Sequence, residues 1–368
     1  MKALFISNDP NIFDAGSPVY ARLRAYAGAI GELHVLSRGR SGAQERHEGA
    51  LSVYPVTRGG AGAFLRLLAE AKRLIREKGI EVVSAQDPFE HGYLALRAVR
   101  GTDAKLHIQI HTDFLSPYFA AESVKNRVRV FIAGRVLPEA DGIRAVSERI
   151  RKSLSARYGS KLAPVSVIPL MNETVATEAG ALPPHGFSFS LFAVSRLEKE
   201  KRVDDILGAL ALVRRTHPDT GLFLAGTGRE ERKLQERAGN LGLEKNVIFL
   251  GWRKNAASLM KQADAFVQAG AYEGYGASLI EAAEAGLPVV STDAGIVGEV
   301  LMPEKDLLAV PPMNKEKLAA AILRLIGDEA LRRALAASAK ETAVRHLASL
   351  GNVPSRIALD LRLAITRS

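Results

Sequence analysis

The stretch that decides the fold class runs from residue 271 to residue 293 and reads Ala271-Tyr-Glu273-Gly-Tyr-Gly276-Ala-Ser278-Leu-Ile-Glu281-Ala-Ala-Glu284-Ala-Gly286-Leu-Pro288-Val-Val-Ser-Thr-Asp293. It follows an apolar run that predicts a strand, it opens a helix near Ala277, and it ends in a second run typical of a buried strand. A strand, a helix and another strand in close succession are typical of a βαβ unit in a parallel sheet. The stretch therefore favours an α/β fold.

The same alternation continues on both sides of this stretch. In the second half of the chain we expect strands 188–194, 221–225, 247–250, 265–268 and 288–292, with helices 203–215, 230–240, 256–262 and 277–285. In the first half we expect strands 3–7, 32–36, 52–56, 81–85, 105–111, 142–146 and 166–168, with helices that include 63–78 and 123–137. The class is α/β throughout.

Two breaks in the pattern divide the chain into domains. Between Met171 and Phe187 the periodicity fails in a run rich in glycine, proline and small residues, which indicates a linker. A second break at residues 350–354 precedes a final helix with apolar residues at helical spacing, namely Ile357, Leu361, Ala364 and Ile365. We expect an N-terminal domain over residues 1–172, a C-terminal domain over 187–350, and a last helix, 353–368, that packs back on the N-terminal domain.

Length and composition exclude several classes of protein. A chain of 368 residues, 47% of them hydrophobic and 24% charged, is long enough for two ordinary globular domains. The absence of cysteine excludes disulfides, iron–sulfur clusters and cysteine-ligated zinc. The apolar start is too short for a signal peptide, and no stretch resembles a membrane span, so we expect a cytoplasmic protein.

The positive charge of the chain is concentrated in its first half. Residues 1–170 hold 25 Lys and Arg against 16 Asp and Glu, which accounts for nine of the ten net positive charges. A basic half indicates an anionic partner, such as a phosphorylated substrate, nucleic acid or an acidic membrane surface. The alternative is a surface that is charged only for solubility.

Several common nucleotide and metal signatures are missing. The sequence has no GxxxxGK[ST], GxGxxG, Asp-x-Asp, HExxH or GxSxG motif. Their absence argues against a P-loop, a carboxylate-held metal, a zincin and an α/β-hydrolase. We expect a mechanism that needs no metal and no cofactor.

The stretch that begins at Ala271 predicts an anion site with carboxylates near it. Gly274 and Gly276 allow the backbone to come close to a ligand, and the helix start at Ala277 and Ser278 presents N–H groups and the positive end of the helix dipole. Glu273 precedes the helix and Glu281 lies about one turn inside it. This spacing suits a ligand with a phosphate in the middle and hydroxyl groups at both ends.

Two further segments point to the same kind of ligand. Arg196 and Lys201 follow the strand 188–194, at the edge where open α/β sheets bind ligands, and a planar guanidinium with a mobile ammonium suits a diphosphate. The turn Ala225-Gly226-Thr-Gly228, between a strand and a helix, is a weaker candidate for backbone contacts to an anion.

At residues 192–310 the sequence resembles the donor-binding domain of the family 4 glycosyltransferases. The resemblance rests on the Ser195-Arg196-Leu197 block with Lys201, the Gly226 turn, Val247–Gly251, the Glu273 and Glu281 pair, and Asp293-Ala-Gly with Gly298-Glu-Val. It implies the GT-B fold, in which two Rossmann-like domains face each other across a cleft. It also implies retaining, metal-independent transfer of a sugar from a nucleotide diphosphate sugar to a glycan, lipid-linked or small-molecule acceptor.

The resemblance implies a role for each of these residues. Arg196 and Lys201 would bind the diphosphate, Glu273 the sugar hydroxyls and Glu281 the ribose diol. In the first half, His111 matches the active-site histidine of the family, and Gly16 matches a glycine-rich loop near the donor phosphate and the acceptor. His111 has a simpler interpretation as a hydrogen-bonded residue at a strand end.

The sequence departs from the family pattern at two places, and other functions stay open. The usual Gly-Gly is Gly16-Ser17, followed by Pro18, and Ala269-Gly270 replaces Pro-Ser before Glu273. The alternatives are a noncatalytic protein that binds nucleotide sugars and a nucleotide-sugar epimerase. The basic, apolar segment 123–137 predicts peripheral contact with an anionic membrane at its inner face, or else a helix packed on its own sheet. We expect no nucleic acid partner.

Overall fold

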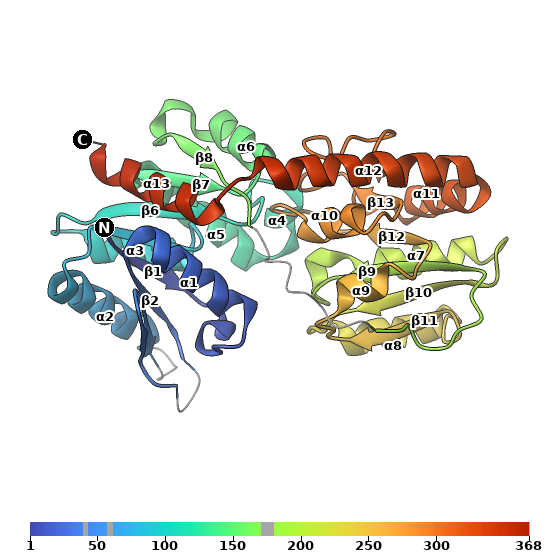
Figure 1. Cartoon of the computed structure of the whole chain (residues 1–368), viewed down its shortest axis with the longest axis horizontal. Coiled ribbons are helices and arrows are strands. Elements are labelled where there is room, and N and C mark those ends of the chain that lie inside the picture. The colour runs from blue at the N-terminus through green and yellow to red at the C-terminus, as the bar shows by residue number, and fades with distance from the viewer. Residues whose placement is uncertain (40–42, 57–61, 171–179, 368) are drawn as a thin grey trace. The chain divides into compact units, whose positions relative to one another are not determined.

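The computed structural model describes residues 1–39, 43–56, 62–170 and 180–367. The chain forms two compact units, one made of Met1–Glu173 with Asn352–Ser368 and the other of Thr174–Gly351. Each unit has its own sheet with helices on both faces (Figure 1). The first part of the predicted linker, 171–179, lies outside the described residues, and residues 180–187 have no regular secondary structure.

The N-terminal unit contains an eight-stranded sheet in the order β3-β4-β2-β1-β5-β6-β7-β8. All neighbouring strands are parallel except β3, which is antiparallel to β4. The strands are β1 Lys2–Ser7, β2 Glu32–Arg38, β3 Arg46–Glu48, β4 Leu51–Val56, β5 Val82–Ala85, β6 Lys105–Ile110, β7 Gly142–Ala145 and β8 Val165–Val167.

The helices of this unit cover both faces of the sheet. They are α1 Pro18–Ile30, α2 Ala63–Lys78, α3 Glu90–Val99, α4 Pro117–Glu122, α5 Val124–Val136, α6 Glu148–Tyr158 and α13 Val353–Thr366. Helix α13 packs beside α1 and against β5, β6 and β7. Helix α3 packs against α2 and against α5. The predicted apolar stripe of α13 is buried at Ile357, Leu361 and Ala364, and Asp360 is buried with them.

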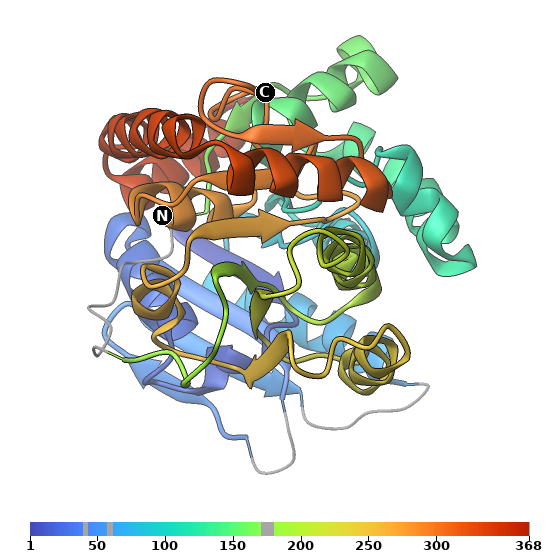
Figure 2. The ribbon, with the colours of Figure 1, turned by 90° about the vertical axis from the view of Figure 1, so that its right-hand side faces the viewer.

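The C-terminal unit contains a six-stranded parallel sheet in the order β11-β10-β9-β12-β13-β14. Its strands are β9 Phe189–Val194, β10 Thr220–Ala225, β11 Val247–Gly251, β12 Ala265–Gln268, β13 Val289–Thr292 and β14 Leu308–Val310. Its helices are α7 Val203–Val213, α8 Glu231–Asn240, α9 Ala256–Met260, α10 Ala277–Glu284, α11 Lys315–Gly327 and α12 Glu329–Ser349 (Figure 2). Helix α7 packs on α8 and α11, and α10 packs on α9 and α12.

The core of the C-terminal unit explains why its sheet forms. Strand β9 is buried along most of its length, as expected of a central parallel strand covered on both faces. Its Leu191 belongs to one buried apolar cluster that also contains Leu207 and Leu210 of α7, Leu222 of β10 and Ile322 of α11. Burial of this apolar surface is the main favourable contribution to folding.

The predicted α/β class is confirmed, and most predicted elements are found within a few residues of their expected bounds. Several ends were placed one or two residues too late. For example, β6 ends at Ile110 rather than His111, α7 at Val213 rather than residue 215, and α9 at Met260 rather than residue 262. Strands β3 and β14 were not predicted because runs of three residues carry almost no periodicity. Helices α1, α3, α4, α6, α11 and α12 were not placed individually from the sequence.

Candidate functional site

Loops from three neighbouring strands meet at the carboxyl edge of the C-terminal sheet. Arg196 and Lys201 follow β9, Gly226 follows β10, and Glu273 follows β12, and these strands are adjacent and parallel. The structure brings Lys201 and Glu273 together, because Lys201 Nζ lies 2.7 Å from Oε1 and 2.8 Å from Oε2 of Glu273. Their side chains are only 18% and 10% exposed, so the pair is largely desolvated.

The loop that carries Glu273 is held by backbone contacts. The Ala271 N–H donates to the Glu200 carbonyl oxygen over 2.9 Å, which joins the β12 loop to the β9 loop. A Cβ atom at Gly270 would lie 2.7 Å from Glu273 Oε1. The departure Ala269-Gly270 therefore has a local reason: glycine leaves the space that the Glu273 carboxylate occupies.

Helix α10 begins directly after this loop without a side-chain cap. Gly276 is the N-cap residue and has a left-handed backbone with φ of 91°, which glycine adopts without strain. Gly274 is buried, Ala277 and Ser278 are half-buried, and Ser278 Oγ donates to Gln268 Oε1 over 2.7 Å. An uncapped helix start presents N–H groups that an anion can satisfy.

Tyr275 ties the same loop to helix α12. Its hydroxyl lies 2.6 Å from His346 Nε2 and donates to it, and burial lowers the pKa of His346, which favours the neutral acceptor form of the ring. Burial raises the pKa of the Tyr275 hydroxyl, so it stays protonated. A single histidine in a polar helix carries no sequence signal for this role, so the contact of Tyr275 with His346 was not predicted.

The other predicted residues of this unit are not drawn into the Lys201–Glu273 pair. Arg196 is exposed and pairs with Glu200 over 3.1 Å, and Glu281 is half-buried on α10. Gly226 has φ of 143°, and a Cβ atom there would lie 1.8 Å from the Ser195 carbonyl oxygen. The Gly226 N–H donates to the Gly251 carbonyl oxygen over 2.8 Å, so the fold itself uses this amide and the need for glycine is one of space.

His111 lies in the N-terminal unit, directly after β6. Its Nε2 atom is 3.1 Å from Gln86 Oε1, and its Nδ1 atom is buried with no hydrogen-bond partner among the described residues. Burial, reinforced by the positive charges of Arg144 and Arg22, lowers the pKa of His111 to about 3. The ring is therefore neutral at neutral pH.

A buried polar chain lies on the same face of the sheet as His111. Asp360 of α13 accepts from His107 Nε2 over 2.9 Å, and His107 Nδ1 lies 2.8 Å from Ser84 Oγ. Gln109 Nε2 donates to Ser84 Oγ over 2.9 Å, and Arg144 Nη1 donates to Gln109 Oε1 over 2.7 Å. These contacts join α13 to β5, β6 and β7, and the sequence analysis predicted none of them.

The Gly16 loop is completed by a helix cap. Ser17 Oγ accepts from the Tyr20 N–H over 3.1 Å and lies 2.7 Å from the carbonyl oxygens of both Asn11 and Asp14, between which its single O–H is shared. The Gly16 N–H donates to Asp14 Oδ1 over 3.0 Å, and Gly16 is exposed. Serine in place of the second glycine thus serves as the N-cap of α1, with Pro18 at the first helical position.

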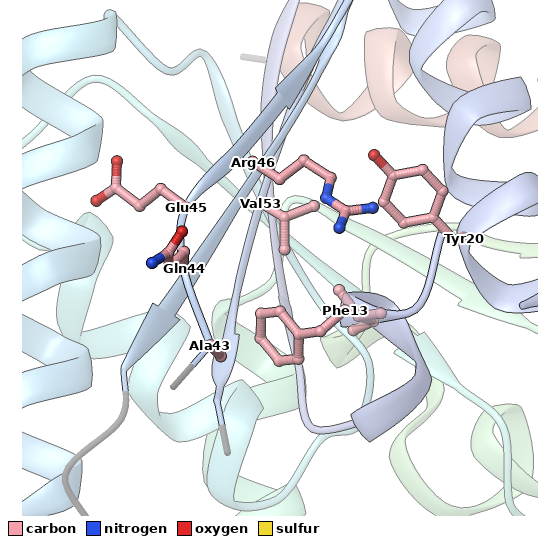
Figure 3. A pocket seen from close by; sticks show the side chains of 8 residues that line it. Phe13, Tyr20, Ala43, Gln44, Glu45, Arg46 and Val53 are labelled. Carbon is pink, nitrogen blue, oxygen red and sulfur yellow. The ribbon is translucent and has the colours of Figure 1, made fainter. Parts of the chain in front are cut away.

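A pocket of about 310 Å³ lies beside this loop, between α1 and the β3–β4 hairpin. It is lined by Ile12, Phe13, Tyr20, Ala43, Gln44, Glu45, Arg46 and Val53. Figure 3 shows Arg46 reaching toward the Tyr20 ring, and its guanidinium carbon lies 5.6 Å from the ring centroid. Glu48 accepts from the Tyr20 hydroxyl over 2.9 Å. The lining is therefore mixed, with aromatic rings and planar polar groups.

The described part of the chain shows neither a cluster of metal-ligating side chains nor a membrane-spanning helix. Residues 1–39, 43–56, 62–170 and 180–367 contain no group of three or more His, Asp or Glu side chains placed to hold a metal ion. Within the same ranges, no helix is both long and apolar enough to cross a membrane.

Two family descriptions match the chain, one in each unit. The description Glycosyl transferases group 1 matches residues 185–342, and Glycosyltransferase Family 4 matches residues 19–171. The glycogen synthase of Mycobacterium tuberculosis is 32% identical over 205 residues, which cover 55% of this chain and 50% of that protein. The chain thus spans about half the length of the curated relatives it matches.

Solved structures share the architecture at low identity. Sucrose-phosphate synthase from Thermosynechococcus elongatus superposes with a TM-score of 0.81 at 17% identity and covers 100% of both chains. Anabaena HepE, solved in complex with UDP and glucose, gives 0.72 at 22% identity over 98% of this chain and 99% of its own. These neighbours confirm the GT-B fold. The two matched family descriptions, which together span residues 19–171 and 185–342, identify the chain as a member of the family 4 glycosyltransferases.

Proposed function

We propose that this protein transfers a sugar, with retention of configuration, from a nucleotide diphosphate sugar to a glycan or lipid-linked acceptor. The observation that carries the proposal is the Lys201–Glu273 pair at the carboxyl edge of the sheet, in which Glu273 lies four residues before Ala277, the first residue of the uncapped helix α10. It combines a cation for phosphate, a carboxylate for hydroxyl groups and helix N–H groups for an anion. HepE, with UDP and glucose bound, is a fold neighbour that binds this class of ligand.

The chemistry that we propose needs no metal. The bond between the anomeric carbon and the leaving phosphate breaks, and the acceptor oxygen forms the new bond on the same face of the sugar. Lys201, Arg196 and the N–H groups at Ala277 and Ser278 stabilise the charge that grows on the diphosphate. The leaving phosphate takes the acceptor proton, so no separate base is needed. Glu273 orients the sugar hydroxyls, Glu281 the ribose, and Gly274 and Gly276 give the ligand space.

The donor is testable by thermal shift with a panel of nucleoside diphosphates and their sugars. A ligand at a hundred times its dissociation constant should stabilise the protein by about 2.7 kcal/mol, which is visible as a higher melting temperature. Adding EDTA should leave both the shift and turnover unchanged. Loss of turnover in EDTA that is restored by a divalent cation would contradict the metal-free mechanism.

The histidine of the N-terminal unit offers a second test. We expect His111→Ala to lower turnover by at least about tenfold while donor affinity changes little, because a positioned neutral imidazole contributes to the transition state more than to ground-state binding. Unchanged turnover would return His111 to the simpler interpretation of a hydrogen-bonded residue after a strand.

Product analysis without acceptor separates the rival functions. A transferase should hydrolyse its donor slowly, an epimerase should convert it to another sugar, and a noncatalytic binding protein should leave it intact. Chromatography and NMR of the recovered nucleotide sugar distinguish these three results. Complete recovery of the donor, both with and without a range of acceptors, would favour the noncatalytic alternative.

For the acceptor side we propose peripheral contact with an anionic membrane through α5. Val124, Val128 and Phe131 are 65%, 51% and 60% exposed, and their spacing places them on one face of the helix. Exposed Lys125 and Arg127 flank this face, and Arg135 lies over the Phe131 ring. The opposite face is buried at Asn126, Ala133 and Val136, so the helix packs on its own unit and still exposes an apolar stripe between cations.

Vesicle co-sedimentation tests this contact. We expect binding to vesicles of phosphatidylcholine with phosphatidylglycerol, weak binding to phosphatidylcholine alone, and a loss on adding salt. Replacing Val124, Val128 and Phe131 together by serine should weaken binding by about tenfold or more. Leu359→Ser, which removes an apolar side chain that is 58% exposed on α13, is the matched control. Equal binding by both variants would remove α5 from the contact.

A further inference from the structure

His111 has one ring nitrogen in use and one without a partner. The ring nitrogen Nε2 lies 3.1 Å from Gln86 Oε1. An amide oxygen only accepts hydrogen bonds, so the ring proton is on Nε2 and Nδ1 carries the lone pair. Nδ1 is buried and has no partner in the part of the chain that the structure describes. A buried acceptor without a donor is unfavourable, so this atom is suited to accept from a ligand.

The backbone fixes the side on which Gln86 presents its amide. The Gln86 N–H donates to the Ile6 carbonyl oxygen over 3.1 Å, which continues the pairing of β5 with β1. Side chains two residues apart on a strand share a face, so Gln86 extends from the same face as Ser84, which contacts His107. His107, Gln109 and His111 are likewise spaced two residues apart along β6 and just after its end, so they share one face of the sheet. Gln86 and His111 are thus adjacent because of sheet register.

The neighbours of His111 oppose a second proton on its ring. Arg144 of β7 is fully buried on this face, Arg22 of α1 adds a second positive charge, and Asp87 after β5 acts in the opposite direction. Burial itself has the largest effect, and together these causes lower the pKa of His111 to about 3. The ring is therefore neutral near neutral pH, and its remaining freedom is which of the two ring nitrogens carries the proton.

We propose that Gln86 is a positioning residue, whose side-chain carbonyl selects the Nε2–H tautomer of His111 and so presents Nδ1 as an acceptor to a hydroxyl group of the ligand. Without Gln86, both neutral tautomers are available. In the Nδ1–H tautomer, Nδ1 would present a proton to the ligand instead of the lone pair that accepts from its hydroxyl group. The identity of that ligand as a sugar rests on the proposed function, whereas the tautomer is a property of the free protein.

Two substitutions separate tautomer from charge. Gln86→Leu removes the acceptor, and we expect the Nδ1–H tautomer to appear. Gln86→Glu keeps an acceptor and adds a negative charge, so the Nε2–H tautomer should persist while the pKa of His111 rises by about 1 to 3 units. Gln235→Glu makes the same chemical change at an exposed position on α8 and should alter neither property. Nitrogen-15 NMR of histidine-labelled protein, with His111 assigned by the His111→Ala variant, reports both.

Turnover measured on the same variants separates this proposal from the proposed function. In Gln86→Leu we expect kcat to fall by about tenfold with little change in KM. In Gln86→Glu the activity should fall toward acid pH more steeply than in wild type, because a protonated Nδ1 no longer accepts. Finding Nδ1–H in the wild type, or an unaltered tautomer in Gln86→Leu, would overturn the proposal. If the tautomer changes in Gln86→Leu but turnover does not, Gln86 does select the tautomer of His111, but His111 does not contribute to sugar transfer.

Discussion

Two helices in this protein begin after loops that carry glycine, one in each unit, and their first turns are completed differently. At α1 the side chain of Ser17 accepts from the Tyr20 N–H, so the helix start is satisfied within the chain. At α10 the N-cap is Gly276, and no side chain caps the first turn. The first turn of α1 is satisfied within the chain, whereas the first turn of α10 has N–H groups without a side-chain cap, the arrangement that favours anion binding at helix starts.

The pairs of ionisable side chains in the two units differ in the same way. Lys201 and Glu273 pair in loops at the edge of a sheet, close to the open start of α10. Asp360 and His107 pair beneath a helix, and their side chains are 7% and 0% exposed. The first arrangement places charge where a ligand is expected, and the second ties α13 to the sheet of its unit.

The largest expected effect comes from breaking the edge pair. Lys201→Met leaves the Glu273 carboxylate largely buried without its cation, so the free energy of unfolding should fall by about 2 to 3 kcal/mol. Nucleoside diphosphate should lose about 1.5 to 3 kcal/mol of binding relative to nucleoside, because the charged hydrogen bond to phosphate is lost. Urea unfolding and calorimetry measure the two. The double variant Lys201→Met with Glu273→Gln should recover stability but not binding. Equal losses of affinity for nucleoside diphosphate and nucleoside would show that Lys201 does not bind phosphate.

The buried pair should show itself in the pH dependence of stability. Burial acts to raise the pKa of Asp360, but the hydrogen bond and charge of His107 outweigh it, and the pKa ends below its ordinary value. A lowered pKa stabilises the fold above the unfolded-state value, about 3.9, and that contribution is lost as the pH falls through the folded value.

Asp360→Asn should therefore destabilise the protein by about 1.5 to 3 kcal/mol at neutral pH and by much less below about pH 3. Chemical unfolding of wild type and variant across this range measures the difference. A difference in the free energy of unfolding between wild type and Asp360→Asn that stays the same at every pH would contradict the lowered pKa of Asp360.

The proposed contact of Glu281 with ribose is tested by a double-mutant cycle. We expect wild type to prefer a ribonucleoside diphosphate over its 2′-deoxy analogue by about 1 to 3 kcal/mol, and Glu281→Ala to show almost no preference. Calorimetric titration of both ligands into both proteins completes the double-mutant cycle. If binding losses are additive, Glu281 is not at the ribose, and if the free protein also melts earlier, its role is structural.

The smallest effect concerns the cap of α1. Ser17→Ala should cost about 1 kcal/mol of stability and Ser17→Gly only a few tenths, because glycine leaves the helix start open to water. Thermal unfolding resolves the first from wild type. Equal losses for alanine and glycine would show that Ser17 acts through its hydrogen bonds to Asn11 and Asp14, which both variants lack, rather than as a cap.

Sequence alone determined the α/β alternation and the loops that carry the candidate site. Those features depend on periodicity along one element and on glycine or charged residues after a strand, and both are visible in one dimension. The stretch from Ala271 to Asp293 predicted a helix start and a strand, and the apolar run before it predicted another strand; α10, β13 and β12 occupy those places.

Only the tertiary structure decided which polar groups meet. Lys201 and Glu273 are 72 residues apart, and Asp360 and His107 are 253 apart, so each contact depends on strand order and on where a distant helix packs. The same holds for Gln86 and His111, and for Tyr275 and His346. Sequence shows that a side chain is polar, whereas the partner that makes its burial tolerable is set by strand register and packing.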